Sequence, residues 1–175
     1  FAYAPAFTGG VRVALGDVNG DGSTDVITGA GSNGGPQVNV FNVDNTTGAV
    51  SLQTSFFAFD EPFFAGGVYV AAADTNDDGF DDVVVGAGAG GGPRVQVYAG
   101  SATGLVTSST LNDFFAYSLA FTGGVVVAAG AGGVEVGIQR EVRRPRHGLR
   151  HKAKNRRPAA NRRHEAEVLV TPEVD

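Results

Sequence analysis

Two short acidic segments carry the side chains best suited to chemistry in this chain. The first reads Asp17-Val18-Asn19-Gly20-Asp21-Gly22-Ser23-Thr24-Asp25, and the second reads Asp74-Thr75-Asn76-Asp77-Asp78-Gly79-Phe80-Asp81-Asp82. Both fit D-x-N-x-D-G-x-x-D, which places oxygen-bearing side chains at positions 1, 3, 5 and 9 of the motif. Ca²⁺ is a hard cation that takes about 6–8 oxygen ligands in flexible geometry. The spacing therefore predicts two calcium-binding loops.

Each loop supplies five predicted ligands. Side chains at positions 1, 3 and 5 converge as the chain curls around the ion, and glycine at position 6 permits the sharp turn. The carbonyl at position 7 points inward, and the aspartate at position 9 closes the shell from the start of the next strand. The predicted ligands are Asp17, Asn19, Asp21, the Ser23 carbonyl and Asp25 in the first loop, and Asp74, Asn76, Asp78, the Phe80 carbonyl and Asp82 in the second. We expect about two Ca²⁺ ions per chain.

Other uses of the two segments are less well supported. Neither contains His or Cys, which argues against zinc or copper, whereas Mg²⁺ stays open despite its stricter octahedral geometry. An EF-hand needs an acidic ligand at position 12 and a helix afterwards, but position 12 is Thr28 or Val85 within a β-branched run. The remaining alternative is an Asp- and Gly-rich hairpin loop that holds no metal.

The elements that position these segments belong to an internal repeat. Residues 7–41 align without gaps to residues 64–98, with identity at 20 of the 35 positions, and a third copy begins at Phe121. Each complete copy holds short β-branched runs separated by Gly, Asn and Pro clusters, and no helical periodicity. The runs predicted as strands are residues 11–15, 25–29, 36–41 and a weaker 50–56 in the first copy, then 68–70, 82–86, 93–98 and a weaker 105–111 in the second.

Four short strands in each repeat of about 57 residues are typical of a propeller blade or a similar stacked β unit. One such sheet cannot bury both faces, so neighbouring units must stack. The predicted fold is all-β, with propeller-type repeats: about two complete four-stranded blades and a partial third. The pairs Phe56-Phe57, Phe63-Phe64 and Phe114-Phe115 are the candidates for packing between units.

These residues resemble the FG-GAP (VCBS-type) repeat of integrin α-subunit propellers. The matching pieces are a Phe-x-Gly-Gly segment before the first strand, the acidic loop, and a Gly-Ala-Gly segment after the second strand. They are Phe7-Thr8-Gly9-Gly10 with Gly29-Ala30-Gly31, and Phe64-Ala65-Gly66-Gly67 with Gly86-Ala87-Gly88. Gly replaces the usual final Pro and an extra Gly follows the Phe, departures that resemble the bacterial secreted branch.

The resemblance covers about residues 1–130. It implies a β-propeller with calcium in the loop between the first two strands of each blade, the same ligands named above, and a secreted, extracellular or cell-surface setting with no signal peptide visible. It also implies a role in adhesion, ligand binding or scaffolding, with an unknown extracellular protein or glycan as ligand and further blades of the same propeller as partners.

The predicted units are a first blade at residues 1–56, a second at 57–114, a truncated third at 115–133 and a basic tail at 134–175. Ala131 stands where the third copy should have its first ligand, and 11 of the 13 Lys and Arg residues fall between Arg140 and Arg163. The tail reads as a basic arm for acidic surfaces, a solvated disordered tail, or sequence beyond a lost reading frame. The abrupt end of the motif favours the last interpretation.

Composition limits the partners. The first 133 residues hold two basic residues against 12 acidic ones, which disfavours nucleic acid, and no apolar stretch is long enough for membrane insertion. We expect no catalysis, because the loops account for most Asp and leave Asp44, Asp60, Glu61 and Asp113 unpaired. The alternatives are a non-catalytic accessory propeller of a secreted polysaccharide-active enzyme, or a purely structural repeat with empty loops. An incomplete ring also predicts marginal folding and aggregation.

Overall fold

The computed structural model describes residues 1–59, 64–131 and 133–138. These residues form ten strands and no helix, so the predicted all-β class is confirmed, and no described segment is a helix able to span a membrane. The strands are β1 (Val11–Gly16), β2 (Asp25–Ala30), β3 (Gln37–Val43), β4 (Val50–Phe57), β5 (Val68–Ala73), β6 (Asp82–Ala87), β7 (Arg94–Tyr98), β8 (Asn112–Phe115), β9 (Val125–Gly130) and β10 (Gly133–Ile138).

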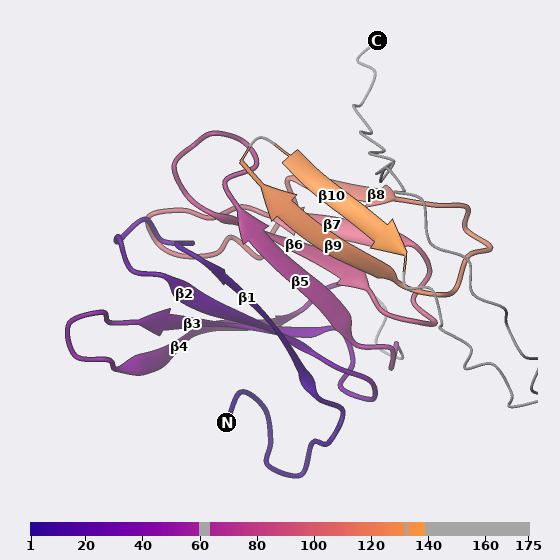
Figure 1. Ribbon diagram of the computed structural model, residues 1–175, viewed down its shortest axis with the longest axis horizontal. Coiled ribbons are helices and arrows are strands. Elements are labelled where there is room, and N and C mark those ends of the chain that lie inside the picture. Colours follow the sequence, from indigo (N-terminus) through magenta and orange to yellow (C-terminus); the bar gives the residue numbers. More distant parts are fainter. Residues whose placement is uncertain (60–63, 132, 139–175) are drawn as a thin grey trace, which may run out of the picture. The chain divides into compact units, whose positions relative to one another are not determined.

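The strands make three antiparallel sheets, ordered β1-β2-β3-β4, β5-β6-β7-β8 and β9-β10. Figure 1 shows them following one another along the chain from indigo to orange. The last pair of the β1–β2 ladder is Gly16↔Asp25, and the last pair of the β5–β6 ladder is Ala73↔Asp82. In both sheets the acidic segment therefore connects the first two strands at the same end of the sheet.

Neighbouring sheets pack through their first strands. β5 contacts both β1 and β2, and β9 contacts both β5 and β6. Val68 of β5 and Val125 of β9 are fully buried at these contacts. Gly29 of β2 and Gly86 of β6 allow the close approach, because a Cβ on Gly86 would lie 2.4 Å from the Val125 carbonyl oxygen. The same packing thus occurs twice, one repeat apart.

Seven of the eight predicted strands are present, and the fourth strand of the second sheet was predicted wrongly. Residues 105–111 form a loop, and the strand is β8. The register of β8 is held by Asp113, whose carboxylate accepts hydrogen bonds from Arg94 Nε (2.8 Å) and from Gln96 Nε2 (2.9 Å) on β7. These cross-strand polar contacts outweigh the higher β propensity of the preceding segment.

The third unit extends beyond the predicted boundary at residue 133. β10 pairs with β9 from Gly133↔Gly130 to Ile138↔Val125. The alternation of Val134 and Val136 with other residues suits this pairing. Both side chains pack against an apolar cluster, called the second apolar cluster below, which consists of Val84, Val95, Val97, Val125 and Val127. The remainder of the predicted basic tail lies outside the described residues.

The aromatic pairs divide between two roles. The Phe56 ring packs on Tyr98 of the neighbouring sheet, with ring centroids 4.7 Å apart, as predicted for contact between units. Phe114 is half-buried against the second apolar cluster. Phe57 and Phe115, however, are 67% and 55% exposed, so the prediction that they pack between units is wrong for these two. Each follows a half-buried Phe in its strand, and alternation turns it outward.

Candidate metal centre

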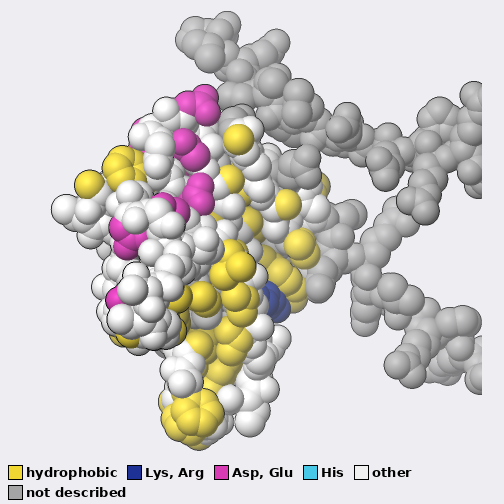
Figure 2. Space-filling model, turned by 60° about the vertical axis from the view of Figure 1, so that its left-hand side comes forward, with side chains coloured by type: hydrophobic (Ala, Val, Ile, Leu, Met, Phe, Trp, Pro, Cys, Tyr) yellow, Lys and Arg dark blue, Asp and Glu magenta, His cyan; other side chains and the backbone are white. Residues whose placement is uncertain are grey.

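Two segments hold all the predicted ligands: residues 17–25 (loop 1), between β1 and β2, and residues 74–82 (loop 2), between β5 and β6. Figure 2 shows acidic side chains gathered towards one side of the visible face. Ladder geometry places both loops at equivalent ends of neighbouring sheets. The two loops are also in direct contact, through backbone hydrogen bonds described below.

Loop 1 curls around the carboxylate of Asp17. Its Oδ1 accepts a hydrogen bond from the Asp21 amide (3.1 Å), and its Oδ2 accepts one from the Gly22 amide (2.9 Å). The Asn19 side-chain amide donates to Asp21 Oδ2 (3.0 Å), and Asp21 Oδ1 accepts from the Ser23 amide (2.7 Å). The structure therefore brings the predicted side-chain ligands at positions 1, 3 and 5 together.

Loop 2 repeats this arrangement bond for bond. Asp74 accepts from the amides of Asp78 (3.1 Å) and Gly79 (2.8 Å). The Asn76 amide donates to Asp78 Oδ2 (2.9 Å), and Asp78 Oδ1 accepts from the Phe80 amide (3.0 Å). The two loops differ in sequence at positions 2, 4, 7 and 8 but share one conformation. The motif residues common to both therefore specify it.

Glycine at position 6 makes the predicted turn. Gly22 has a φ of +80° and Gly79 a φ of +89°, a left-handed conformation that costs glycine little and other residues more. Position 4 is also left-handed, at Gly20 and at Asp77. Asp and Asn tolerate this conformation better than most residues, which accounts for the non-glycine residue there.

The position-9 aspartate of loop 1 is buried with an unsatisfied oxygen. Asp25 is fully buried, and its Oδ2 accepts a hydrogen bond from the Val18 amide (3.2 Å). Its Oδ1 makes no hydrogen bond of normal geometry, although the Val43 amide lies close enough to lower the pKa of this carboxyl. Burial, with a smaller contribution from the nearby carboxylates of Asp21 and Asp17, raises the pKa of Asp25 to about 6, while the amides of Val18 and Val43 act in the opposite direction. A buried acceptor without a donor costs free energy, and a bound cation would remove that cost.

The position-9 aspartate of loop 2 is satisfied by the protein. Asp82 is also fully buried, but its Oδ1 accepts from the Gly100 amide (3.1 Å). Its Oδ2 accepts from the Thr75 amide (3.1 Å) and from the Thr75 hydroxyl. Loop 1 has Val18 in place of Thr75, so the hydroxyl is missing there. The two loops therefore differ at the residue that closes the predicted shell.

Two of the exposed loop carboxylates are held ionised by backbone amides. The Ser23 amide lowers the pKa of Asp21, with a smaller contribution from Asn19. The Gly79 amide lowers the pKa of Asp74 in the same way. Each carboxylate oxygen has two lone pairs, so a carboxylate that accepts one amide hydrogen bond can still ligate an ion.

The donor set fits calcium, although carboxylates alone do not complete a site. Within the described residues, no group of three or more His, Cys, Asp or Glu side chains is placed to hold a metal ion. Asn19 and Asn76 and the carbonyls at position 7 would have to contribute, as the motif predicts. All of these donors are oxygens, the kind of ligand that calcium prefers.

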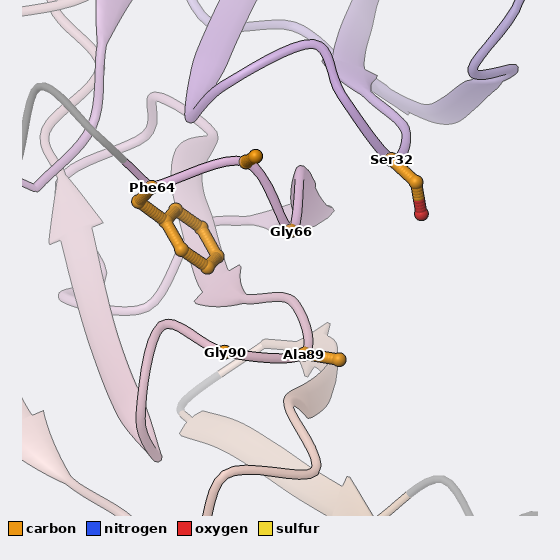
Figure 3. A pocket seen from close by; sticks show the side chains of 6 residues that line it. Ser32, Phe64, Gly66, Ala89 and Gly90 are labelled. Carbon is orange, nitrogen blue, oxygen red and sulfur yellow. The ribbon is translucent and has the colours of Figure 1, made fainter.

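A second feature is a shallow hollow of about 420 Å³ beside the Phe-x-Gly-Gly segment of the second blade. Figure 3 shows the Phe64 ring, Gly66, Ala89 and Gly90 around it, with Ser32 from the first blade at its margin. The Phe64 ring covers glycines of its own blade, where a Cβ on Gly66 would lie 2.6 Å away. Among the described residues that line the hollow, Ser32 alone has a polar side chain.

The sequence interpretation missed several polar contacts. Arg12 donates to the Val68 carbonyl oxygen (2.9 Å) and lies 3.9 Å from the centre of the Tyr69 ring, which joins the first two blades. Asp113 was predicted to be unpaired but forms an ion pair with Arg94. The sequence signal that could have revealed these contacts is the pair of basic residues, Arg12 and Arg94, in an otherwise acidic segment. Each needs a nearby partner for its charge.

Comparison with known proteins supports the resemblance found in the sequence. Residues 9–52 match the model of the FG-GAP repeat family. This range contains β1, loop 1, β2 and β3, and reaches into β4.

One curated relative is Integrin alpha-PS3 from Drosophila melanogaster. It is 36% identical over 106 residues, which cover 55% of this chain and 9% of that protein. The chain therefore corresponds to a small part of this relative. The two matches support an FG-GAP, integrin-α-like repeat, while the bacterial secreted branch stays a prediction.

Proposed function

We propose that the chain is a calcium-binding FG-GAP repeat module that presents an extracellular or cell-surface ligand-binding surface and performs no catalysis. The observation that carries the calcium part is the pair of loops with one oxygen motif and one hydrogen-bond pattern. The fully buried Asp25 Oδ1, which makes no hydrogen bond of normal geometry, supports it further.

The ion's contribution would be structural. Bound calcium neutralises the crowded carboxylates of a loop and supplies a partner for oxygens that lack one. In loop 1 the residues that would hold it are Asp17, Asn19, Asp21, the Ser23 carbonyl and Asp25. Because Asp17 follows β1 directly and Asp25 begins β2, these ligands join the ends of the two strands.

The non-catalytic part is supported by the carboxylates outside the loops. Asp44 accepts hydrogen bonds from the amides of Thr46 (2.8 Å) and Thr47 (3.1 Å) and so closes a turn. Asp113 pairs with Arg94. Asp44 and Asp113 thus have structural partners, and Asp60 and Glu61 lie outside the described residues. The similarity to an integrin α chain supports the cell-surface setting.

A purely structural repeat with empty loops is the second candidate. The observation that favours it is the set of amide hydrogen bonds that the aspartates at positions 1 and 5 of both loops already accept. A three-carboxylate cluster is also absent from the described residues. The two candidates differ in one property, the affinity for calcium.

Calcium-dependent unfolding distinguishes them. We expect calcium to raise the free energy of unfolding of the full chain by about 2.7 kcal/mol per site at 100 times the dissociation constant. Urea denaturation with calcium, with magnesium and with a chelator measures this. Asp21→Asn with Asp78→Asn should remove the calcium effect, whereas Asp44→Asn, outside the loops, should retain it. Equal stability of the wild type in all three conditions would leave the structural repeat as the answer.

A further inference from the structure

Loop 1 and loop 2 are joined by a reciprocal pair of hydrogen bonds. The Asp17 amide donates to Asp81 Oδ2 (2.8 Å), and the Asp81 amide donates to the Asp17 carbonyl oxygen (3.0 Å). Asp17 is the first predicted ligand of loop 1. Asp81 is not a ligand in the motif, but it directly precedes Asp82, the last predicted ligand of loop 2. Asp81 therefore connects the two candidate sites through both its side chain and its main chain.

The surrounding structure is built to accept this contact. A Cβ on Gly16 would lie 2.9 Å from Asp81 Oδ2 and 2.8 Å from the Cβ of Ala72, so only glycine leaves room for the carboxylate. On the other side of loop 1, a Cβ on Gly20 would lie 2.6 Å from the Phe80 ring. Loop 1 is thus seated on residues 80 and 81 of loop 2.

A third hydrogen bond fixes the same junction. The Ser101 amide donates to the Val18 carbonyl oxygen (3.0 Å), and the neighbouring Gly100 amide donates to Asp82 Oδ1 (3.1 Å). Val18 itself donates to the buried Asp25. Residues 100 and 101 therefore contact loop 1 and the closing aspartate of loop 2 at once, and the two loops cannot shift independently.

We propose that Asp81 is a positioning residue that couples the two cation sites, so that occupancy of one loop raises the affinity of the other. This inference rests on the calcium binding proposed above. An ion in loop 2 would fix Asp82 and with it the adjoining Asp81, which holds the main chain of Asp17 in place. Coupling of this kind is reciprocal by thermodynamic necessity.

The sequence offers a distinctive sign of this role. Position 8 is Asp81 in loop 2 but the exposed Thr24 in loop 1, and only loop 2 lies against a preceding blade within the described structure. The position that faces a neighbouring loop is the one that carries a carboxylate.

Site-resolved calcium titration of the full chain by amide NMR tests the coupling. Gly22 and Gly79, at position 6 of each loop, give separate signals for loop 1 and loop 2. In Asp81→Ala, we expect the calcium midpoint read from Gly22 to rise about 5-fold or more. Asp77→Asn removes one charge from loop 2 at a side chain that makes no contact with loop 1, and should shift that midpoint less than about 2-fold.

Two further variants extend the test. One separates the effect of the Asp81 hydrogen bond from that of its charge, and the other removes the loop 2 site without altering the junction. Asp81→Asn keeps an acceptor without the charge, so its Gly22 midpoint should stay near that of Asp77→Asn. Asp78→Ala disables loop 2 while leaving the junction intact, and coupling predicts a rise in the Gly22 midpoint similar to that in Asp81→Ala.

The outcomes are distinct. Three results would overturn the coupling alone. They are a Gly22 midpoint in Asp81→Ala equal to that in Asp77→Asn, a rise in this midpoint in Asp81→Asn as large as that in Asp81→Ala, and an unchanged midpoint in Asp78→Ala. A folded wild type in which neither glycine signal responds to calcium overturns the proposed calcium function, and the coupling with it.

Discussion

At the scale of single residues, the most informative group is the carboxylate of Asp25. It is fully buried, one of its oxygens makes no hydrogen bond of normal geometry, and its pKa is raised to about 6 by burial. A protein keeps such a group only where something offsets its cost, and an all-oxygen loop indicates a cation. Asp82, at the equivalent position, is instead bonded by Thr75 and Gly100.

The raised pKa of Asp25 predicts a pH dependence without calcium. Because the folded chain holds this proton to a higher pH than the unfolded chain, the contribution of Asp25 to the free energy of unfolding falls as pH rises from about 4 to about 6. Relative to Asp25→Asn, the wild type should lose about 2 kcal/mol between pH 4.5 and pH 7. Urea denaturation in the presence of a chelator measures the difference.

Asp77→Asn is the charge-matched control for Asp25→Asn, since Asp77 is exposed. Its pH profile should run parallel to that of the wild type. If the profile of Asp25→Asn is also parallel to the wild type, the assignment of a buried, unsatisfied carboxylate is wrong.

At the scale of strands and sheets, glycines set how closely the blades approach. Gly86 lies in β6 directly beneath β9, where a Cβ would contact the Val125 carbonyl oxygen at 2.4 Å and Val127 at 2.8 Å. Gly29 plays the same part beneath β5. The Gly-Ala-Gly segment is therefore a packing requirement of the repeat as well as its sequence signature.

Gly86→Ala should destabilise the chain by about 1–3 kcal/mol, because the contacted atoms include backbone that cannot move aside. Gly130→Ala is the matched control, because a Cβ added at this end of β9 would meet open space. It should change stability by less than about 0.5 kcal/mol. Thermal unfolding compares the two. Similar melting temperatures for both variants would contradict the close packing of β6 and β9.

The pairing of β7 with β8 depends on Asp113 and Arg94. Their hydrogen bond lowers the pKa of Asp113, so its stabilisation is present above the ordinary carboxyl pKa and is lost as pH falls through the lowered value. Both side chains are partly exposed, so we expect about 0.5–1 kcal/mol. Asp113→Asn should lower stability at pH 7 and converge with the wild type near pH 2. A constant difference at all pH values would contradict the ion pair.

Much of the fold followed from periodicity. Alternating or β-branched runs predicted seven strands, and the position of the acidic loops followed from the hairpins that contain them. The fourth strand of the second blade was missed because β8 has only four residues, two of them polar, and its pairing depends on Asp113 reaching Arg94 across the sheet. Such tertiary contacts leave no local periodicity.

The residues of the candidate site could be predicted from the sequence, but the contacts between its two loops could not. The motif predicted the glycine turn at position 6, which both loops adopt, whereas the assignment of the ligands stays a prediction. The contact of Asp81 with loop 1 joins residues 64 positions apart, and no spacing within one loop reveals it. The difference between Asp25 and Asp82 likewise depends on Gly100, which belongs to another part of the sheet.

At the scale of the whole molecule, the first blade exposes a sheet face whose equivalents in the second and third units are buried. Val11, Val13 and Leu15 on β1 are 47%, 59% and 62% exposed. The equivalent strands β5 and β9 pack against the blade before them, with Val68 and Val125 fully buried. The repeat thus shows what covers such a face, namely the first and second strands of another blade.

This face predicts self-association of the chain. A second copy can supply the missing sheet, so sedimentation velocity should show concentration-dependent oligomers of the wild type. Val13→Lys with Leu15→Lys should shift the chain towards monomer, because burying two charges in an apolar contact is costly. Leu119→Lys, at a residue 70% exposed in a loop, is the control. A wild type that stays monomeric at high concentration contradicts the prediction.

Calorimetric titration of calcium into the full chain tests the central claim most directly, beside a variant carrying Asp17→Ala and Asp74→Ala. The account predicts saturable binding near two ions per chain, with dissociation constants on the order of 10⁻⁴–10⁻³ M, and loss of both sites in the variant. A folded wild type that binds no calcium, or a variant that binds as the wild type does, would contradict it.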